Sequence, residues 1–294
     1  MANLVVIGSS NTDMVVKTNR FPQPGETIVG GEFFLFPGGK GANQAVAAAR
    51  LGGEVRFVAR VGDDLFGQQA REGFVREGID VTHVSTDNET ASGTALITIN
   101  SQGENSIVVA PGANANLLPD HLSKVDFNQA DIVLAQLETP LPTIMAAAGH
   151  AKGRFLLNPA PATTLPAEVY DGLFAITPNE TETELLTGIL PTDLRTCDLA
   201  AKTFHERGVQ HVVITLGAKG CYYSGPEGSQ QIAAAKVKPV DTTAAGDVFN
   251  GALAVALAEG QQWHDALKFA VRAATISVTR MGAQPSVPFR TELV

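Results

Sequence analysis

The amino-acid sequence predicts an α/β fold with a central, mostly parallel sheet, helices on both faces, and a small β-sheet lid. The first observation is that short β-branched runs alternate with Ala-rich or amphipathic stretches along most of the 294 residues. Such alternation is typical of a parallel sheet with crossover helices. The second is that residues 13–37 and 91–110 break this rhythm, because apolar and polar residues alternate there around turn signals. That pattern indicates antiparallel hairpins.

The elements follow one another in a regular order. The short apolar runs predict buried parallel strands over Leu4–Ile7, Val55–Val58, Ile132–Ala135, Phe155–Asn158, Leu173–Thr177 and His211–Leu216. The stretches between and after them predict helices over Ala42–Leu51, Leu65–Glu77, Leu141–Ala151, Thr181–Thr187, Asp198–Arg207, Gly246–Glu259 and Trp263–Thr279.

The two hairpin regions are separate in the sequence but share one pattern. Residues 13–37 turn around Pro24-Gly25, and residues 91–110 turn at Gly103. We interpret them as two insertions that build one small sheet on a single α/β domain of residues 1–294. Such a sheet could close over a pocket, or pair with a second copy of the chain through its exposed face. We expect a homodimer of this kind.

Composition limits the classes of partner. The chain has 21 Lys and Arg against 30 Asp and Glu, so its formal net charge is −9. We expect no nucleic-acid partner, because such binding needs a basic face. A few local donors could still bind a small phosphorylated ligand. No 18-residue apolar stretch and no targeting segment is visible, so we expect no membrane partner and a cytoplasmic location. Cys197 and Cys221 are expected to be free thiols.

Two common nucleotide-binding motifs are missing. The P-loop pattern fails at Gly39-Lys40, because Gly41 stands where a hydroxyl residue is required and Phe34 where the first glycine is required. The dinucleotide fingerprint also fails, because the first predicted strand is followed by Gly8-Ser9-Ser10-Asn11-Thr12-Asp13. A Rossmann-type cofactor site is therefore disfavoured.

A glycine-rich segment opens the first predicted helix. Gly38-Gly39-Lys40-Gly41-Ala42-Asn43-Gln44 combines glycines, which allow close approach of the backbone to a ligand, with the donors Lys40 and Asn43. The alternative is an ordinary glycine turn before a helix, which is common. Taken alone, this segment leaves both interpretations open.

A second segment joins small residues to an acid. In Asp241-Thr242-Thr243-Ala244-Ala245-Gly246-Asp247, the amides of Ala244 to Asp247 would be unpaired at the first turn of an apolar helix and could bind an anion. Asp247 could then act as a base beside that anion, taking a proton from an attacking hydroxyl group. The alternative is a helix-capping acid, and it is the more common use of such a residue.

Taken together, these segments resemble the ribokinase family of sugar kinases, also called the PfkB family. The resemblance covers essentially the whole chain, including both hairpin insertions. It rests on segments that occur in the family's order, including both family signatures: Asn11 with Asp13, Gly38–Asn43, Asn179–Glu182, Thr215–Gly220 and Asp241–Asp247. The segments Gly8–Asp13, Gly38–Gln44 and Gly282-Ala283-Gln284-Pro285-Ser286 are most similar to the members that use ribose.

The resemblance implies a sugar site. Asn11 and Asp13 would bind the ribose hydroxyls, and a carboxylate suits a vicinal diol because it accepts from two adjacent hydroxyls. Further sugar contacts would come from Gly39, Lys40, Gly41, Asn43 and Glu138. Without the resemblance, Glu138 could equally be a surface acid at the end of a strand.

The resemblance also implies the catalytic and nucleotide residues. Asp247 would be the catalytic base and a substrate contact, and the amides of Ala244, Ala245 and Gly246 would stabilise the transferring group. The residues implied to bind ATP are Asn179, Thr215, Gly217, Lys219, Gly220 and Gly246.

Two cations are implied as well. Glu182 would serve Mg²⁺ through water, although Asn179 and Glu182 also fit a helix capping box, and both interpretations can hold together. A monovalent K⁺ is implied at Asp241, Thr243, Ser277, Arg280, Gly282 and Ser286, several of them through backbone oxygens. Arg280 could contribute only its carbonyl, because a guanidinium group is never an acceptor.

The activity expected from the resemblance is ATP-dependent phosphorylation of D-ribose on its 5-hydroxyl, giving ribose 5-phosphate and ADP. One alternative is a kinase for deoxyribose or for another pentose or ketose, and Asn11 and Asp13 favour a sugar with a 2-hydroxyl over deoxyribose. Another is a catalytically idle sugar-binding regulator, which Asp247 and the intact loop before it argue against.

Overall fold

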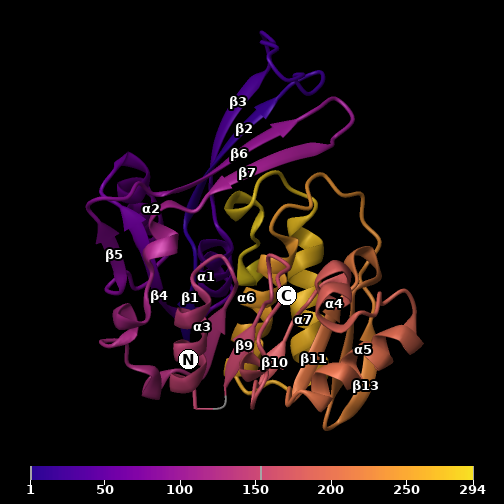
Figure 1. The fold of residues 1–294 in the computed structure, drawn as a ribbon. Helices are drawn as coiled ribbons and strands as arrows, with labels where there is room; N and C mark the ends of the chain where they lie inside the picture. Colours follow the sequence, from indigo (N-terminus) through magenta and orange to yellow (C-terminus); the bar gives the residue numbers. More distant parts are fainter. Residues whose placement is uncertain (1, 153, 294) are drawn as a thin grey trace.

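The computed structural model describes residues 2–152 and 154–293, which form two sheets (Figure 1). The larger sheet has the strand order β13-β12-β11-β10-β9-β8-β1-β4-β5, and the smaller has the order β3-β2-β6-β7. The strands of the larger sheet are β1 (Ala2–Ile7), β4 (Gly53–Gly62), β5 (Val84–Asp87), β8 (Ile132–Ala135), β9 (Phe155–Leu157), β10 (Ala175–Ile176), β11 (His211–Thr215), β12 (Cys221–Gly225) and β13 (Gly228–Ile232). Those of the smaller sheet are β2 (Asn11–Lys17), β3 (Glu32–Gly38), β6 (Gly93–Ile99) and β7 (Asn105–Ala110).

Helices cover both faces of the larger sheet. They are α1 (Lys40–Arg50), α2 (Leu65–Arg76), α3 (Leu141–His150), α4 (Glu180–Thr187), α5 (Leu194–Glu206), α6 (Ala245–Ala258) and α7 (Trp263–Ser277). Successive residues of a strand point to opposite faces, and in β1 Leu4 and Val6 join one buried cluster with α1, α6 and α7. Val5 and Ile7 join the other, with α3 and α5. The predicted α/β fold, with a small additional sheet, is confirmed.

The order in which successive strands are added to the larger sheet reverses at β1. This strand pairs in parallel with β4 on one side and with β8 on the other. From β8 the order runs outward through β9 and β10 to β11, whereas β4 leads to β5 at the opposite edge. In open α/β sheets, a ligand site lies outside the carboxyl ends of the strands at such a switch point. The fold therefore directs attention to the residues that follow β1 and β8.

Most predicted strands and helices occur where expected, and the differences have local causes. Helix α5 begins at Leu194, four residues before the predicted start, because Asp193 caps it by accepting a hydrogen bond from the Thr196 amide over 2.8 Å. The antiparallel hairpin β12–β13 was not predicted, because Ser, Gly and Gln interrupt its alternation. Strand β5 was missed as well.

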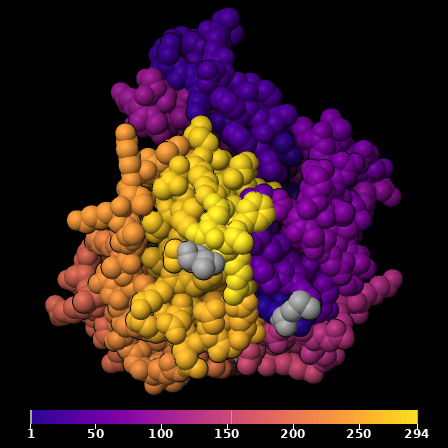
Figure 2. Space-filling view, turned by 180° about the vertical axis from the view of Figure 1, so that it is seen from behind, coloured from indigo at the N-terminus to yellow at the C-terminus, as the bar shows by residue number. Residues whose placement is uncertain are grey.

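The smaller sheet, which we call the lid, projects from the main body (Figures 1 and 2). The two predicted hairpins are joined by parallel pairing of β2 with β6, so that Met14 lies opposite both Leu35 and Leu96. Asp13, the neighbour of Met14, interacts electrostatically with groups of the main body. Leu35 and Leu96 therefore lie on the outward face of the lid, where they are 49 % and 55 % exposed.

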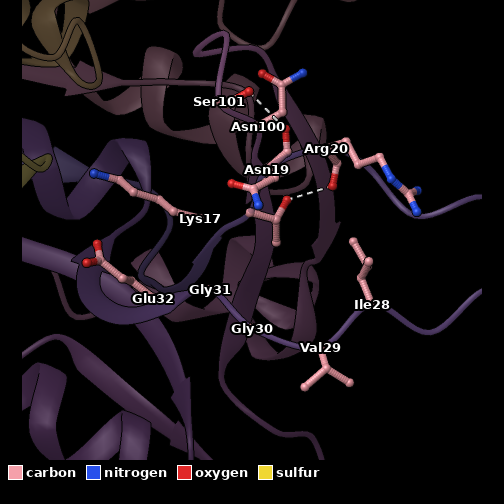
Figure 3. A pocket seen from close by; sticks show the side chains of 11 residues that line it. Lys17, Asn19, Arg20, Ile28, Val29, Gly30, Gly31, Glu32, Asn100 and Ser101 are labelled. Carbon is pink, nitrogen blue, oxygen red and sulfur yellow. Dashed lines mark hydrogen bonds between the residues drawn. The ribbon is translucent and has the colours of Figure 1, made fainter.

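A hollow of about 570 Å³ lies at the far end of the lid (Figure 3). It is lined by the ends of β2 and β3 and by the loop between them, including Lys17, Val29 and Glu32. The loop is fastened there because Ser101 donates from Oγ to the carbonyl of Asn19 over 2.9 Å. Lys17 is four residues along β2 from Asp13, so this hollow is separate from the sheet's switch point.

Two further observations bear on the sequence-based expectations. Among the described residues, no helix is both long enough and apolar enough to cross a membrane. Cys197 and Cys221 are both buried and free.

The contact between α1 and α6 leads to a stability prediction. A Cβ atom added to Gly251 would lie 2.7 Å from Ala47 Cβ and 2.7 Å from the Gln44 carbonyl oxygen, so Gly251→Ala must push the two helices apart. We expect a loss of about 1–3 kcal/mol in the free energy of unfolding, measured by urea denaturation. The control is Gly73→Ala in α2, where only the end of Arg76 comes within 4 Å. It should be neutral or slightly stabilising, and equal effects of the two substitutions would contradict the packing argument.

Candidate active site

Polar side chains collect where the central strands end. Ser9 follows β1, Glu138 follows β8, and Asn158 and Thr177 stand directly after β9 and β10. In the larger sheet β4, β1, β8, β9, β10 and β11 run parallel to one another, so these residues share one edge of the sheet. Electrostatic interactions place Asp13 at the same edge, close to Glu138 and to a carboxyl group in the first turn of α6.

That carboxyl group belongs to Asp247, which is only 5 % exposed. Its Oδ2 accepts a hydrogen bond from Asn43 Nδ2 over 3.0 Å, and its Oδ1 accepts one from Gln44 Nε2 over 3.0 Å. Burial raises the pKa of Asp247, while Lys40, Asn43 and Gln44 act to lower it. Each carboxylate oxygen has a further lone pair, so Asp247 can still accept a proton or a hydrogen bond from a ligand.

Lys40 is the cation of this cluster. Burial acts to lower the pKa of its ammonium group, but nearby carboxylates, led by Asp247 and Glu138, outweigh that effect and raise it. Burial also raises the pKa of Asp13 to about 6, helped by the negative charges of Glu138 and Asp247. In Glu182 burial again raises the pKa, against hydrogen bonding from Asn179. The site thus holds more negative than positive groups.

Glu138 fastens the first loop to the start of α1. Its Oε2 accepts from Ser9 Oγ over 2.5 Å and from the Lys40 amide over 2.9 Å. Neither bond uses Oε1. Glu138 is therefore not a free surface acid, because one of its oxygens holds two segments of the site together and the other is available to a ligand.

Two glycines permit this close packing. Gly39 has φ +87° directly before α1, a conformation that other residues rarely adopt. A Cβ atom on Gly41 would lie 2.5 Å from the backbone of Gly8 and Ser9. The amide of Gly41 already donates to Ser9 Oγ over 3.3 Å. The structure thus explains Gly41 by packing against the first loop.

Asn11 is oriented by a residue that the sequence did not single out. Asn114, which is 1 % exposed, donates from Nδ2 to Asn11 Oδ1 over 2.7 Å. It also accepts from the Ser10 amide over 2.9 Å. With its oxygen engaged in this way, Asn11 presents its two N–H donors to the remaining space.

The loop before Asp247 only partly matches the expected anion site. Ala244 has φ +61° and precedes α6, and the amides of Ala244, Gly246 and Asp247 donate to no acceptor among the described residues. The amide of Ala245, however, donates to the Thr242 carbonyl over 3.3 Å. The expectation that every amide from Ala244 to Asp247 is unpaired is therefore wrong for Ala245, because the loop turns back on itself. No atom of the described part of the chain lies within 4 Å of a Cβ atom built on Gly246.

The predicted nucleotide residues lie at the ends of β10 and β11. Asn179 and Glu182 form the expected capping box of α4, in which the Glu182 amide donates to Asn179 Oδ1 over 2.8 Å and Glu182 Oε2 accepts from the Asn179 amide over 2.9 Å. The Thr215 amide donates to the Pro178 carbonyl over 2.9 Å, which brings the two strand ends together.

The two glycines in the segment after Thr215 have different surroundings. Gly217 has φ +51°, and nothing lies within 4 Å of an added Cβ atom, so its surroundings are open. Gly220 instead packs against the neighbouring strand, since an added Cβ atom would lie 1.9 Å from the Ile232 carbonyl. Lys219 is exposed, and its Nζ lies 3.5 Å from the Thr192 carbonyl. The structure does not bring Lys219 into the carboxylate cluster.

Asp241 joins two of the segments expected around a monovalent cation. Its Oδ1 accepts from the Thr243 amide over 2.9 Å and its Oδ2 from the Gly282 amide over 2.9 Å. Burial acts to raise the pKa of Asp241, but these hydrogen bonds outweigh it and lower the pKa. The Arg280 guanidinium is paired with Glu292, and since it has no acceptor atom only the backbone oxygen of Arg280 could bind a cation. Ser277 and Ser286 use their hydroxyls to donate to the carbonyls of Ala274 and Ala283.

The structure adds buried polar side chains that the sequence did not single out. Gln44, Gln136, Asn158, Thr177 and Asn250 are each at most 6 % exposed and are connected to Asp247 by hydrogen bonds. A signal was present: three of them are the first polar residues after the apolar runs of β8, β9 and β10. No group of three or more His, Cys, Asp or Glu suited to a metal was found in the described part of the chain.

The partly buried position of Asp13 leads to a prediction about stability. Its folded-state pKa of about 6 exceeds the ordinary 3.8, so this group destabilises the fold above pH 6 by on the order of 3 kcal/mol at most, and the penalty fades as the pH falls towards 4. Asp13→Asn should therefore raise Tm by several degrees at pH 7.5 and by less at pH 4.5.

Asp64→Asn provides the matched control, measured by thermal unfolding at the same two pH values. Asp64 caps α2 and accepts hydrogen bonds from the amides of Gly67 and Ser92, which outweigh burial and lower its pKa. This variant should lose stability at pH 7.5. A gain for Asp13→Asn that does not depend on pH would show that burial of its charge is not the cause.

Comparison with known proteins yields full-length matches. A 45 % identical ribokinase of Haemophilus influenzae aligns over 98 % of this chain and 96 % of its own length. A 36 % identical deoxyribokinase of Salmonella typhi aligns over 97 % and 95 %. The structure of Arabidopsis thaliana ribokinase complexed with ribose and ATP superposes with a TM-score of 0.93 at 35 % identity, covering 100 % of this chain and 98 % of that one.

The family assignment covers both sheets and every segment of the site. The family described as pfkB family carbohydrate kinase matches residues 1–290, which include the lid, the carboxyl edge of the larger sheet and the loop before Asp247. This protein is accordingly a member of the pfkB family of carbohydrate kinases.

Proposed function

We propose that this protein transfers the γ-phosphoryl group of ATP to the 5-hydroxyl of D-ribose. The observation that carries the proposal is the buried carboxylate of Asp247, which lies directly after the free amides of Ala244 and Gly246. A base next to donors for an anion is what a kinase needs where a hydroxyl attacks a phosphoryl group. Support for the two substrates comes from the Arabidopsis relative, whose structure holds ribose and ATP.

The sugar site is proposed from groups that lack partners. Asn43 Oδ1 is buried and has no hydrogen-bond partner among the described residues. No described group donates to the Asp13 carboxylate, although Asp13 is partly buried. Asn11 offers N–H donors beside them. Two acceptor groups with an amide donor suit a polyhydroxylated ligand, because each sugar hydroxyl both donates and accepts. Gly39, Lys40, Gly41 and Glu138 would line the same site.

Asp247 is the proposed base. It would take the proton of the 5-hydroxyl as that oxygen attacks the γ-phosphorus, and the bond from phosphorus to the bridging oxygen of ADP would break. The free amides of Ala244 and Gly246 would donate to the phosphoryl oxygens. The Ala245 amide would join them only if its 3.3 Å bond to Thr242 opened. The proposed ATP contacts are Asn179, Thr215, Gly217, Lys219, Gly220 and Gly246.

We propose two cation sites at the edges of this centre. Glu182 is a single carboxylate whose oxygens already bind Asn179, which fits Mg²⁺ held through water rather than directly. Asp241 is kept charged beside the carbonyls of the 241–243 and 277–286 segments, which fits K⁺ at Asp241, Thr243, Ser277, Arg280, Gly282 and Ser286. Bound there, the cations would neutralise phosphate charge and hold the loop before Asp247.

A homodimer through the lid is also proposed. The outward face presents Phe33, Leu35, Leu96 and Val108 at 49–65 % exposure across all strands of the lid except β2, whose Met14 and Val16 are partly buried. A second copy could cover such a face with the same residues, as two-fold symmetry requires. The cytoplasmic location stays a prediction, supported by the two free cysteines.

The alternative sugar is 2-deoxyribose. It is favoured by one observation, the 36 % identity to the deoxyribokinase of Salmonella typhi. Against it stand the unpartnered oxygens of Asp13, which would have one hydroxyl fewer to bind. A catalytically idle regulator is the weaker alternative, because Asp247 and the amides before it are in place.

Asp247→Asn tests the catalytic proposal. The amide keeps the shape of the side chain but cannot take a proton, so kcat should fall at least about 10²-fold while ribose binding, measured by calorimetry, is largely kept. Asp265→Asn is the control, since Asp265 also lies in the first turn of a helix, α7, but away from the site, and it should keep full activity. Wild-type turnover by Asp247→Asn would refute the assignment.

Sugar discrimination tests the role of Asp13. A carboxylate acceptor left without its hydroxyl costs on the order of 1–3 kcal/mol, which corresponds to roughly 5–150-fold in kcat/KM. Ribose should therefore be preferred over 2-deoxyribose at least about tenfold. In Asp13→Ala the preference should shrink and activity on ribose should fall. Equal use of both sugars by the wild type would instead favour the deoxyribose alternative.

Oligomeric state tests the role of the lid. Light scattering should give a dimer at micromolar protein, and Leu96→Lys should shift it towards the monomer because a charge would be buried in the interface. Leu199→Lys in α5 changes another exposed leucine, 44 % exposed, and should leave the dimer intact. A wild-type monomer at this concentration would count heavily against the proposed interface.

A further inference from the structure

The carboxylate of Asp247 is held by a glutamine that is itself held on two other sides. Gln44 is fully buried, and its Nε2 lies 3.0 Å from Asp247 Oδ1 and 3.0 Å from Asn158 Oδ1. Its Oε1 accepts a hydrogen bond from Gln136 Nε2 over 2.5 Å. Every polar atom of the Gln44 side chain therefore has a protein partner, and its amide has little freedom to turn.

The direction of these hydrogen bonds starts from the main chain. Asn158 donates from Nδ2 to the carbonyl oxygen of Thr177 over 3.0 Å, and a carbonyl oxygen can only accept. This bond turns Asn158 Oδ1 towards Gln44. Gln44 must then present Nε2 to both Asn158 and Asp247, which leaves Oε1 for Gln136. The backbone carbonyl of Thr177, directly after β10, thus determines which atom of Gln44 faces Asp247.

The same network returns to α6 from the other side. Thr177 donates from Oγ1 to Asn250 Oδ1 over 2.6 Å, and Asn250 donates from Nδ2 to the Gly246 carbonyl over 2.8 Å. Gly246 directly precedes Asp247, so the hydrogen bonds close into a ring. We call this the amide ring, and its side chains are those of Gln44, Asn158, Thr177 and Asn250.

We propose that the amide ring is a positioning device that sets together the orientation of the Asp247 carboxylate and of the peptide group between Gly246 and Asp247. The ring joins the proposed base to the peptide group whose N–H belongs to Asp247, an amide that donates to no described acceptor, through side chains that are at most 6 % exposed. Its members are positioning residues, because each acts on the reacting groups through another residue. The inference rests on the proposed role of Asp247 as the base.

Gln44 adds a neutral donor to a site that is crowded with charge. The charged groups acting on Asp247 are Lys40, which favours its ionised form, and the carboxylates of Asp13, Glu138 and Glu182, which oppose it. Removing the Gln44 donor would leave this balance of charges unchanged and take away one hydrogen bond to the ionised form. The pKa of Asp247 should then rise.

Gln44→Met in the full chain tests the inference, because methionine keeps the length of the side chain and removes its donor. Loss of a hydrogen bond to a charged group should lower kcat about 10–100-fold. The KM for ribose should change far less, and the acidic limb of the pH–rate profile should move up by about one pH unit. Gln136→Met should act in the same direction, although Gln136 does not touch Asp247. It should add nothing in a Gln44→Met background, because it acts only through Gln44.

Thr143→Val is the matched control. Thr143 is fully buried and donates from Oγ1 to the Leu117 carbonyl over 2.6 Å, so the variant loses one buried hydrogen bond outside the site. It should lower Tm without changing the pH–rate profile. Wild-type kcat and an unchanged pH–rate profile in both Gln44→Met and Gln136→Met would overturn the inference. A loss of kcat in these two variants without any shift of the acidic limb of the pH–rate profile would overturn it as well. An active Asp247→Asn would instead overturn the proposed function.

Discussion

The burial of one negative charge governs how this site is built. The Asp247 carboxylate is almost fully removed from solvent, and such a group is stable only with donors and a nearby cation. Asn43 and Gln44, from the first turns of α1, provide the donors, and Lys40 of the same helix provides the charge. These contacts require the N-termini of α1 and α6 to meet. The close approach of the two helices at Gly251, where no side chain fits, makes this possible.

The need to bring donors to the Asp247 carboxylate also explains why the site lies at β1, where the strand order of the larger sheet reverses. The loops after β1 and β8 approach each other there, and Glu138 uses a single oxygen to join Ser9 to the start of α1. Strand β2 of the lid adds Asp13 to the site, although the carboxylates of Glu138 and Asp247 are nearby. An acid in that position costs the unliganded fold stability, which is a common property of sites arranged for a ligand rather than for the empty protein. A hydroxylated ligand would give the Asp13 oxygens the hydrogen bonds they lack.

The sequence was sufficient to predict the layers of the fold and most of the residues that gather at the site. Alternating apolar runs located β1, β8 and β11, and the motifs located Asp13, Lys40 and Asp247. It was not sufficient for the hairpin β12–β13, whose polar residues hide the strand period, or for the early start of α5 at its Asp193 cap. The amide ring was also missed, because its members come from two helices and the ends of two strands, and their connection depends on hydrogen-bond direction in three dimensions. The expectation of an unpaired Ala245 amide was wrong for a related reason. The loop folds back in three dimensions, so that the Ala245 amide donates to the Thr242 carbonyl.

The central claim is that the group buried at the start of α6 directs phosphoryl transfer to one hydroxyl of ribose. Its most direct test is the identity of the product formed from D-ribose and MgATP, determined by ³¹P and ¹³C nuclear magnetic resonance in the presence of K⁺. The account predicts stoichiometric ADP and a phosphate ester on carbon 5 alone. Phosphate on another carbon, or ATP hydrolysis without any sugar ester, would contradict it.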